Sequence, residues 1–158
     1  MSASYFEGCE FEIREDLCVA HEKAWKRIGA AGTWLNGSRR VAVAAEIREA
    51  RARSSCGEVR EALSPEMVKV ENLTSSLLND AEVELIHRVV CDPGRLSKAW
   101  SKSIIERGLS EGEYVEIVGL IAMVMILDTF TMGLGLSNTE LPESQAGEPT
   151  HYTPPGAK

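Results

Sequence analysis

The longest apolar segment of the chain lies in its C-terminal half. No side chain from Ile117 to Leu127 is polar, so a helix over this segment would have to be buried on every side. The segment is shorter than the roughly 20 apolar residues that cross a bilayer. The pattern therefore predicts a buried central helix in an all-α domain rather than a membrane span.

The ends of this central helix carry recognisable signals. Ser110 and Glu113 form the S-x-x-E pattern of a capping box, which predicts where the helix begins. Gly133 and Gly135 are suited to ending it, since glycine readily adopts the left-handed backbone of a helix C-terminus. We therefore expect the helix to cover about 111–136.

Apolar residues at helical spacing predict further helices along the chain. The turn residues Asn36-Gly37-Ser38 separate the first two, with Ser38 as the expected N-cap of the second. Asn79 to Glu82 resembles a cap, and Asp92-Pro93-Gly94 ends the helix that follows it. The expected segments are helices at about 11–32, 39–55, 80–91 and 95–107, a short helical piece opened by Ser64-Pro65, and a loop at 72–79.

The second of these helices has two apolar faces and two polar strips. Opposed apolar faces predict a helix wedged between neighbours, with one polar strip facing water and the other free to line a pocket. The sequence leaves open which strip does which. The apolar faces are Val43, Ile47 and Ala50 on one side and Val41, Ala45 and Ala52 on the other. The polar strips are Arg40, Arg48 and Arg51 on one side and Glu46, Glu49, Arg53 and Cys56 on the other, with Arg60 next if the helix continues.

Composition limits the classes of partner and the cellular location that we expect for this chain. The net charge of −7 and the pI near 5.1 argue against nucleic acid or an anionic membrane as a partner. The four cysteines lack the spacing of a disulfide framework and fit a reducing compartment. No apolar run follows Met1, so we expect no signal peptide and a cytoplasmic protein. No His, Cys and carboxylate spacing favours a metal site, and we expect no cofactor.

The domain organisation follows from the same patterns. A chain of 158 residues fits a single domain with a core of its own. We expect a flexible arm over 1–10, the all-α domain over 11–136 and a Pro/Gly-rich tail over 137–158. Four of the six prolines follow position 141, so the tail should be extended or disordered until it meets a partner surface.

Two blocks of the chain carry short motifs in a recognisable order. The first block consists of Arg39 to Arg48 (RRVAVAAEIR), Cys56 and Ala62 to Pro65 (ALSP). The second runs from His87 to Leu136 and includes Asp92 to Leu96 (DPGRL), Trp100, Gly108 to Ser110 (GLS), Tyr114 to Glu116 (YVE) and Asp128 to Phe130 (DTF). With these motifs, and with a cysteine near the end of the second helix, the chain resembles the alkylhydroperoxidase D-like and carboxymuconolactone decarboxylase superfamily over about 39–136.

This resemblance implies an all-α fold of the alkylhydroperoxidase D-like type in compact homo-oligomers, commonly trimers or hexamers. Peroxidase members of the superfamily carry C-x-x-C, with a histidine four residues after the second cysteine. One thiolate there attacks a hydroperoxide, and the other cysteine closes a disulfide. In this chain Arg53 stands at the first cysteine and Arg60 at the histidine, so Cys56 alone remains. Decarboxylase members use no cysteine pair, so the fold can carry other chemistry.

Cys56 is the candidate nucleophile. Arg53 and Arg60, each about one helical turn away, would stabilise its thiolate, whereas a nearby helix C-terminus would oppose it. Glu46 or Glu49 could serve as a general base beside it. The alternative for Glu49 is an ordinary surface pair with Arg53, four residues on.

Three further polar residues have both a functional and a structural interpretation. His87 lies on the apolar side of its helix, where it is either a general acid–base or a hydrogen-bonded core residue. His21, beside Trp25, is a weaker candidate of the same kind. Asp128 follows the apolar run, so burial would require a partner, which Arg39, Arg95 or His87 could supply. The structural alternative for Asp128 is a salt bridge that ties helices together.

Two functions remain open. In one, Cys56 alone reduces a small-molecule hydroperoxide, and an external thiol reductant resolves the sulfenic acid. In the other, the chain is a non-catalytic helical module that has lost the redox motif and binds a small molecule or only its own copies. Both include a homo-oligomer, which the apolar central helix favours.

Overall fold

The computed structural model describes residues 5–53, 55–62 and 76–156 of the chain. These residues form helices and no strand, which confirms the predicted all-α fold. The helix opened by Ser64-Pro65 and the first half of the loop at 72–79 lie outside the described residues. The helices are α1 Glu15–Gly29, α2 Gly37–Ala52, α3 Ser55–Glu61, α4 Asp80–Cys91, the short 3-10 helix η2 Pro93–Arg95, α5 Lys98–Glu106 and α6 Glu111–Gly133.

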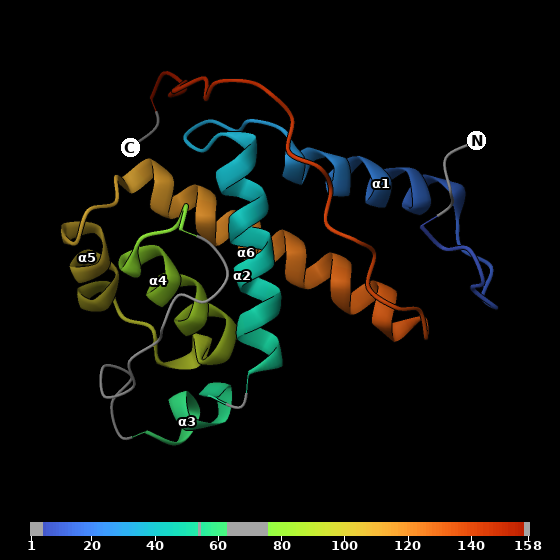
Figure 1. Ribbon diagram of the computed structural model, residues 1–158, viewed down its shortest axis with the longest axis horizontal. Coiled ribbons are helices and arrows are strands. Elements are labelled where there is room, and N and C mark those ends of the chain that lie inside the picture. The colour runs from blue at the N-terminus through green and yellow to red at the C-terminus, as the bar shows by residue number, and fades with distance from the viewer. Residues whose placement is uncertain (1–4, 54, 63–75, 157–158) are drawn as a thin grey trace.

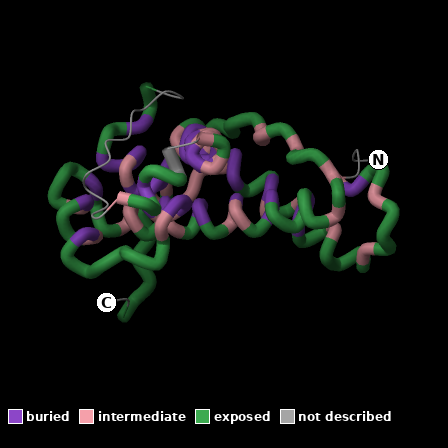
Figure 2. Tube along the Cα trace, turned by 90° about the horizontal axis from the view of Figure 1, so that it is seen from below, coloured by how far each residue is buried: buried purple, intermediate pink, exposed green. Residues whose placement is uncertain are grey.

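The fold is organised around α2, which crosses α6 and also packs against α1, α3 and α4 (Figure 1). Val43, Ile47 and Ala50 of α2 are completely buried, so the prediction of a helix wedged between neighbours is confirmed. The second predicted apolar face is wrong for Ala52, which is exposed at the end of the helix. Buried positions gather between the helices, whereas the C-terminal end of the chain is exposed (Figure 2).

The central helix α6 begins as predicted and is buried on one side only. The capping box between Ser110 and Glu113 is present, and the helix ends at Gly133, three residues before the predicted end. Val115 and Ile126 are 68% and 67% exposed, so the prediction of burial on every side is wrong for the single chain. Length and composition alone would let α6 cross a membrane, as they would for the core helices of many soluble proteins.

Local caps explain the other helix starts. Asn79 and Glu82 form a complete capping box at the start of α4, as predicted. At α2, however, the side chain of Asn36 accepts a hydrogen bond from the Arg39 amide at 2.9 Å, so Asn36 rather than Ser38 is the N-cap. In α1 the buried side is formed by His21, Trp25 and Ile28.

The tail is extended, as predicted, but it binds its own domain. The amides of Gln145 and His151 donate to the carbonyls of Gly29 and Thr33, each at 2.8 Å. A Cβ at Gly29 would lie 2.3 Å from the carbonyl oxygen of Glu143, so this close approach requires glycine. The tail therefore lies along the α1–α2 loop (Figure 1).

The described part of the N-terminal arm is also tied to the domain. Phe6 is 8% exposed and meets the rings of His21 and Phe130 edge-on, at centroid distances of 5.0 and 5.9 Å. Burial of an aromatic ring is favourable by a few kcal/mol at most, which is enough to hold a short segment. The arm therefore connects the start of the chain to the C-terminal part of α6.

Candidate functional site

Two of the predicted site residues meet in the core between α2 and α4. Glu46 and His87 are 0% and 1% exposed, and His87 Nε2 lies 2.7 Å from Glu46 Oε1. Their neighbours along the two helices, Ile47 and Ile86, are completely buried apolar residues. The pair is therefore a buried, hydrogen-bonded carboxylate–imidazole dyad.

The hydrogen bond defines how the neutral imidazole is protonated. A carboxylate only accepts hydrogen bonds, so Nε2 of His87 carries the proton and Nδ1 is left as an acceptor. Burial lowers the pKa of His87, and the positive charge of Arg53 acts in the same direction. The hydrogen bond and charge of Glu46, helped by Glu49, oppose this shift without reversing it. His87 is therefore a neutral base around pH 7, oriented by a carboxylate.

A cysteine sulfur lies between the same two helices, α2 and α4. Cys91 follows His87 by one turn of α4, is 1% exposed and is disulfide-bonded. Its Sγ lies 3.7 Å from the carbonyl oxygen of Ala50, which follows Glu46 by one turn of α2. The carboxylate, the imidazole and the sulfur thus occupy successive turns of two helices that run side by side.

The short helix α3 is held against the end of α4 by arginine side chains. Arg60 Nε donates to the carbonyl oxygen of Cys91 at 2.6 Å. Arg95, which is paired with Asp92 at 2.6 Å, donates to the carbonyls of Val59 and Ala62 at 2.5 and 2.6 Å. These bonds satisfy carbonyls at the end of α3 that have no partner within the helix. They hold α3 against the C-terminal end of α4, which carries Cys91.

The predicted surroundings of Cys56 need correction. Helix α2 ends at Ala52, because Arg53 adopts an extended backbone with φ −73° and ψ 140°. Cys56 therefore belongs to the first turn of α3 rather than to the end of the second helix, and its side chain lies outside the described residues. Arg53 bonds to Glu49 at 2.9 Å, as the surface-pair alternative predicts. Arg53 caps the end of α2, whereas Arg60 belongs to α3 and contacts Cys91. The two predicted thiolate-stabilising arginines therefore do not lie on one continuous helix.

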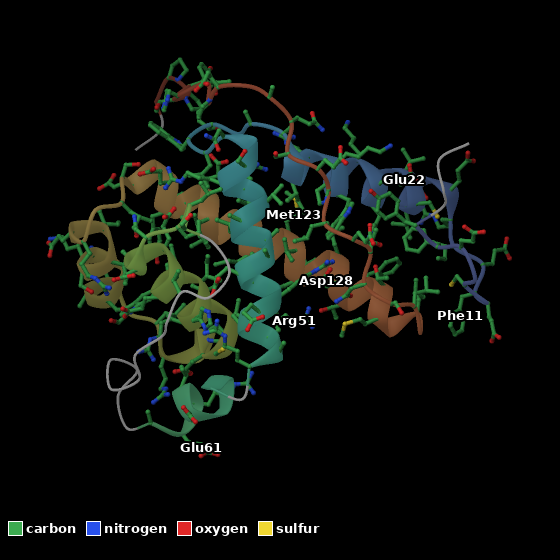
Figure 3. The ribbon with its side chains drawn as sticks, in the orientation of Figure 1. Phe11, Glu22, Arg51, Glu61, Met123 and Asp128 are labelled. Atoms are coloured by element: carbon green, nitrogen blue, oxygen red, sulfur yellow. The ribbon has the colours of Figure 1, made fainter. Side chains whose placement is uncertain are left out.

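Asp128 is a structural residue. It is 2% exposed, and Arg48 binds both of its carboxylate oxygens at 2.7 and 3.0 Å. Arg51 lies 3.8 Å away on the same side of the crossing between α2 and α6 (Figure 3). The predicted salt bridge between helices is thus confirmed, with partners on α2 in place of Arg39, Arg95 or His87. The polar strip with Arg48 and Arg51 faces α6, and the strip with Glu46 faces α4.

A cavity of about 510 Å³ lies at the other end of α2, away from the dyad. Its walls include Trp34 and the ion pair between Arg40 and Glu116, together with Met123 of α6. None of Glu46, His87 or Cys91 borders it. The cavity and the dyad are therefore separate features of the fold.

Sequence reasoning missed Cys91, which the structure adds to the site. The available signal was its spacing of four from His87, which puts both side chains on one face of a helix. His21, the weaker histidine candidate, packs against Phe6 and Phe130 and does not approach the dyad residues of α2 and α4. Burial lowers the pKa of His21, against a raising effect of Asp128, as expected for a core histidine.

Within the described part of the chain, no group of three or more His, Cys, Asp or Glu side chains could hold a metal ion. The arrangement instead supplies a proton acceptor one helical turn from a cysteine. No family model, no curated protein and no solved structure matches this chain, so the superfamily resemblance stays a prediction drawn from the residues quoted above.

Proposed function

We propose that this chain is a thiol-dependent hydroperoxide reductase of the alkylhydroperoxidase D-like type. Cys56 is the attacking thiol, and Glu46 and His87 are the proton relay. The observation that carries the proposal is the buried hydrogen bond between Glu46 and His87, one helical turn from a disulfide-bonded cysteine. A carboxylate-oriented neutral imidazole is the arrangement by which enzymes deprotonate thiols and hydroxyls.

The energetic cost of the dyad supports a functional role. Burial of an ionisable pair costs desolvation free energy, and well-packed apolar residues of similar volume are often as stable or more stable. Glu46 and His87 are surrounded along both helices by residues such as Val43, Ile47 and Ile86, which are fully buried. An apolar pair would extend that core without a polar group, so stability alone does not explain the dyad.

The reaction balances as two steps. The thiolate sulfur of Cys56 attacks the distal oxygen of a hydroperoxide ROOH, the O–O bond breaks, and ROH leaves with one proton. Sulfur is oxidised to a sulfenic acid, and the peroxide oxygen is reduced. Two equivalents of a thiol then return Cys56 to the thiol, releasing water and a disulfide. His87 accepts the proton of the attacking thiol and returns it to the leaving oxygen, so no free hydroxide or alkoxide is released.

Peroxide consumption by site variants tests this proposal. The parent protein should consume an organic hydroperoxide when a small-molecule thiol is added, and Cys56→Ser should abolish that consumption. Cys18→Ser is the matched control, because Cys18 is a free thiol on α1. The proposal is wrong if the parent consumes no more peroxide than the added thiol alone, or if Cys56→Ser matches the parent.

We also infer self-association through the exposed side of α6. Its exposed positions recur at intervals of four and three residues, the heptad spacing of a helix that packs along another helix. The small residues among them would let two backbones approach closely, and a second copy of α6 in a two-fold arrangement fits the seam. The seam consists of Val115, Gly119, Ala122, Ile126, Thr129 and Gly133.

Light scattering in reducing buffer measures this association. We expect a mass above that of the 17.3 kDa monomer for the parent protein. Ile126→Glu should lower the mass, because it puts a charge into the seam. Val19→Glu, at an exposed position of α1, should leave the mass unchanged. A monomeric parent contradicts self-association, and an unchanged mass in Ile126→Glu contradicts this seam.

A further inference from the structure

We propose that Cys91 is the resolving thiol, which closes an intramolecular disulfide with Cys56 after each attack on peroxide. The inference rests on the proposed function and replaces the external resolving thiol that the missing C-x-x-C motif suggests. The chain has four cysteines, of which Cys9 and Cys18 are free thiols and Cys91 is disulfide-bonded. Cys56 is the partner that remains within the chain.

The placement of α3 supports this pairing. Positions 56 and 60 lie four residues apart on one face of α3. The long side chain of Arg60, an exposed residue, donates to the carbonyl oxygen of Cys91 at 2.6 Å. The bonds from Arg95 to the last carbonyls of α3 hold the helix in the same place. Cys56, one turn before Arg60, thus belongs to a helix that is held against the end of α4, where Cys91 lies.

The surroundings of Cys91 suit a resolving rather than an attacking thiol. Its side chain is 1% exposed, so a hydroperoxide from solution cannot reach it. His87, one turn earlier on α4, can accept its proton, and Glu46 holds the imidazole in place. A buried cysteine that must become a thiolate needs such a base, because burial disfavours the charged form.

The resolving step balances without a further oxidant. The Cys91 thiolate attacks the sulfur of the Cys56 sulfenic acid, an S–S bond forms, and the S–OH bond breaks. The leaving hydroxide takes the proton that His87 has received from Cys91, so water is the second product. Two equivalents of a small-molecule thiol then reduce the disulfide. They must enter at the Cys56 sulfur, since Cys91 is buried.

The pairing is tested by peptide mass mapping under non-reducing conditions, after reduced protein is oxidised either with one equivalent of hydroperoxide or with the general thiol oxidant diamide. We expect a Cys56–Cys91 peptide in both samples and free Cys9 and Cys18. Diamide makes this result independent of peroxidase activity. A Cys91 that stays free in both samples, or pairs with Cys9 or Cys18, overturns the inference.

A resolving role is tested with Cys91→Ser and a sulfenic-acid-specific alkylating dione. The variant should still consume the first equivalent of peroxide, but it should accumulate trapped sulfenic acid at Cys56, at least 10-fold more than the parent. Cys18→Ser, the matched control, should trap as little as the parent. Equal trapping in parent and Cys91→Ser overturns the resolving role while the proposed function stands. A parent that forms the Cys56–Cys91 peptide with diamide but consumes no peroxide overturns the proposed function instead.

Discussion

Helices α2 and α4 meet at two buried polar contacts that behave in opposite ways. At the start of α2, Arg39 bonds to Glu82 at 2.6 Å and to Glu113 of α6 at 2.8 Å. Two turns further along, Glu46 bonds to His87 at 2.7 Å. Both contacts join the same two helices, and in each a carboxylate is almost completely buried.

The balance between burial and pairing differs at the two contacts. Burial lowers the pKa of Arg39, but the hydrogen bonds and charges of Glu82 and Glu113 outweigh it, and the pKa rises. At His87 burial also lowers the pKa, and there the hydrogen bond and charge of Glu46 are too weak to reverse the shift. The first contact is therefore a permanent ion pair that holds helices together. The second retains a base that can take up a proton, which a reaction can use.

The largest expected effect is on activity at the second contact. In His87→Gln the amide can still donate to Glu46, but it cannot accept a proton from a thiol. Peroxide consumption should fall by about 10²–10⁴-fold, the usual contribution of a general base. The free energy of unfolding should stay within about 1 kcal/mol, because one hydrogen bond replaces another.

Glu46→Gln should behave in the same way, with Glu49→Gln as the matched control one turn further along α2. Glu49 is half-exposed and paired with Arg53, so its loss should change activity by less than about 3-fold, in line with the small contribution of surface ion pairs. If Glu46→Gln or His87→Gln keeps full activity and loses much of its stability, the dyad is structural. The Glu46–His87 contact would then have the same role as the Arg39–Glu82 contact.

The next effect is on stability at the first contact. Arg39→Ala leaves the carboxylate of Glu82, which is 1% exposed, without its cation. The free energy of unfolding in urea should fall by about 3 kcal/mol, as for other buried carboxylates that lose their partner. Arg107→Ala, which removes an exposed pair with Glu84, should cost less than about 1 kcal/mol. Equal losses in the two variants would mean that burial of Glu82 does not matter.

Truncation after Leu136 separates stability from activity. The tail binds the α1–α2 loop through three backbone hydrogen bonds, and it accepts hydrogen bonds from Trp25 and Arg48. Its removal should lower the free energy of unfolding by about 2 kcal/mol, because each hydrogen bond contributes about 1 kcal/mol or less. Peroxide consumption measured well below the unfolding midpoint should be unchanged. A selective loss of activity would connect the tail to the dyad.

The smallest effect is the pH dependence of stability. The folded-state pKa of His87 is lowered, so below about pH 6.5 the unfolded chain binds a proton that the folded chain does not. Stability is therefore complete above that pH and falls as the pH drops towards the folded-state pKa, by at most about 1.4 kcal/mol per pH unit for one histidine.

His87→Gln should remove part of this slope, and His21→Gln should remove another part, because the pKa of His21 is lowered as well. Urea unfolding at pH 5.0, 6.0 and 7.5 measures both. A slope that is the same in the parent and in both variants would show that neither histidine is held neutral by burial.

The starts of α4 and α6 could be predicted from the sequence. The capping boxes at Ser110 and Asn79 join residues three apart, and the apolar spacing of α4 and α5 is local as well. The cap at Asn36 was missed in favour of Ser38, because several adjacent turn residues can cap a helix and only the backbone path selects one. The side of α6 that would stay exposed was also beyond the sequence, since a helix that is apolar all round gives no sign of which face its neighbours cover.

The sequence by itself determined an all-α chain, the capping boxes that begin α4 and α6, and Glu46 and His87 as separate candidates. These follow from interactions between residues a few positions apart, which a linear pattern records. Only the tertiary structure decided that Glu46 meets His87 across 41 positions, that Arg48 rather than Arg39 neutralises Asp128, and that Cys91 of α4 lies against Ala50 of α2. Such contacts depend on how two helices are rotated and shifted against each other. That arrangement is selected by the packing of the whole core, which no single stretch of sequence specifies.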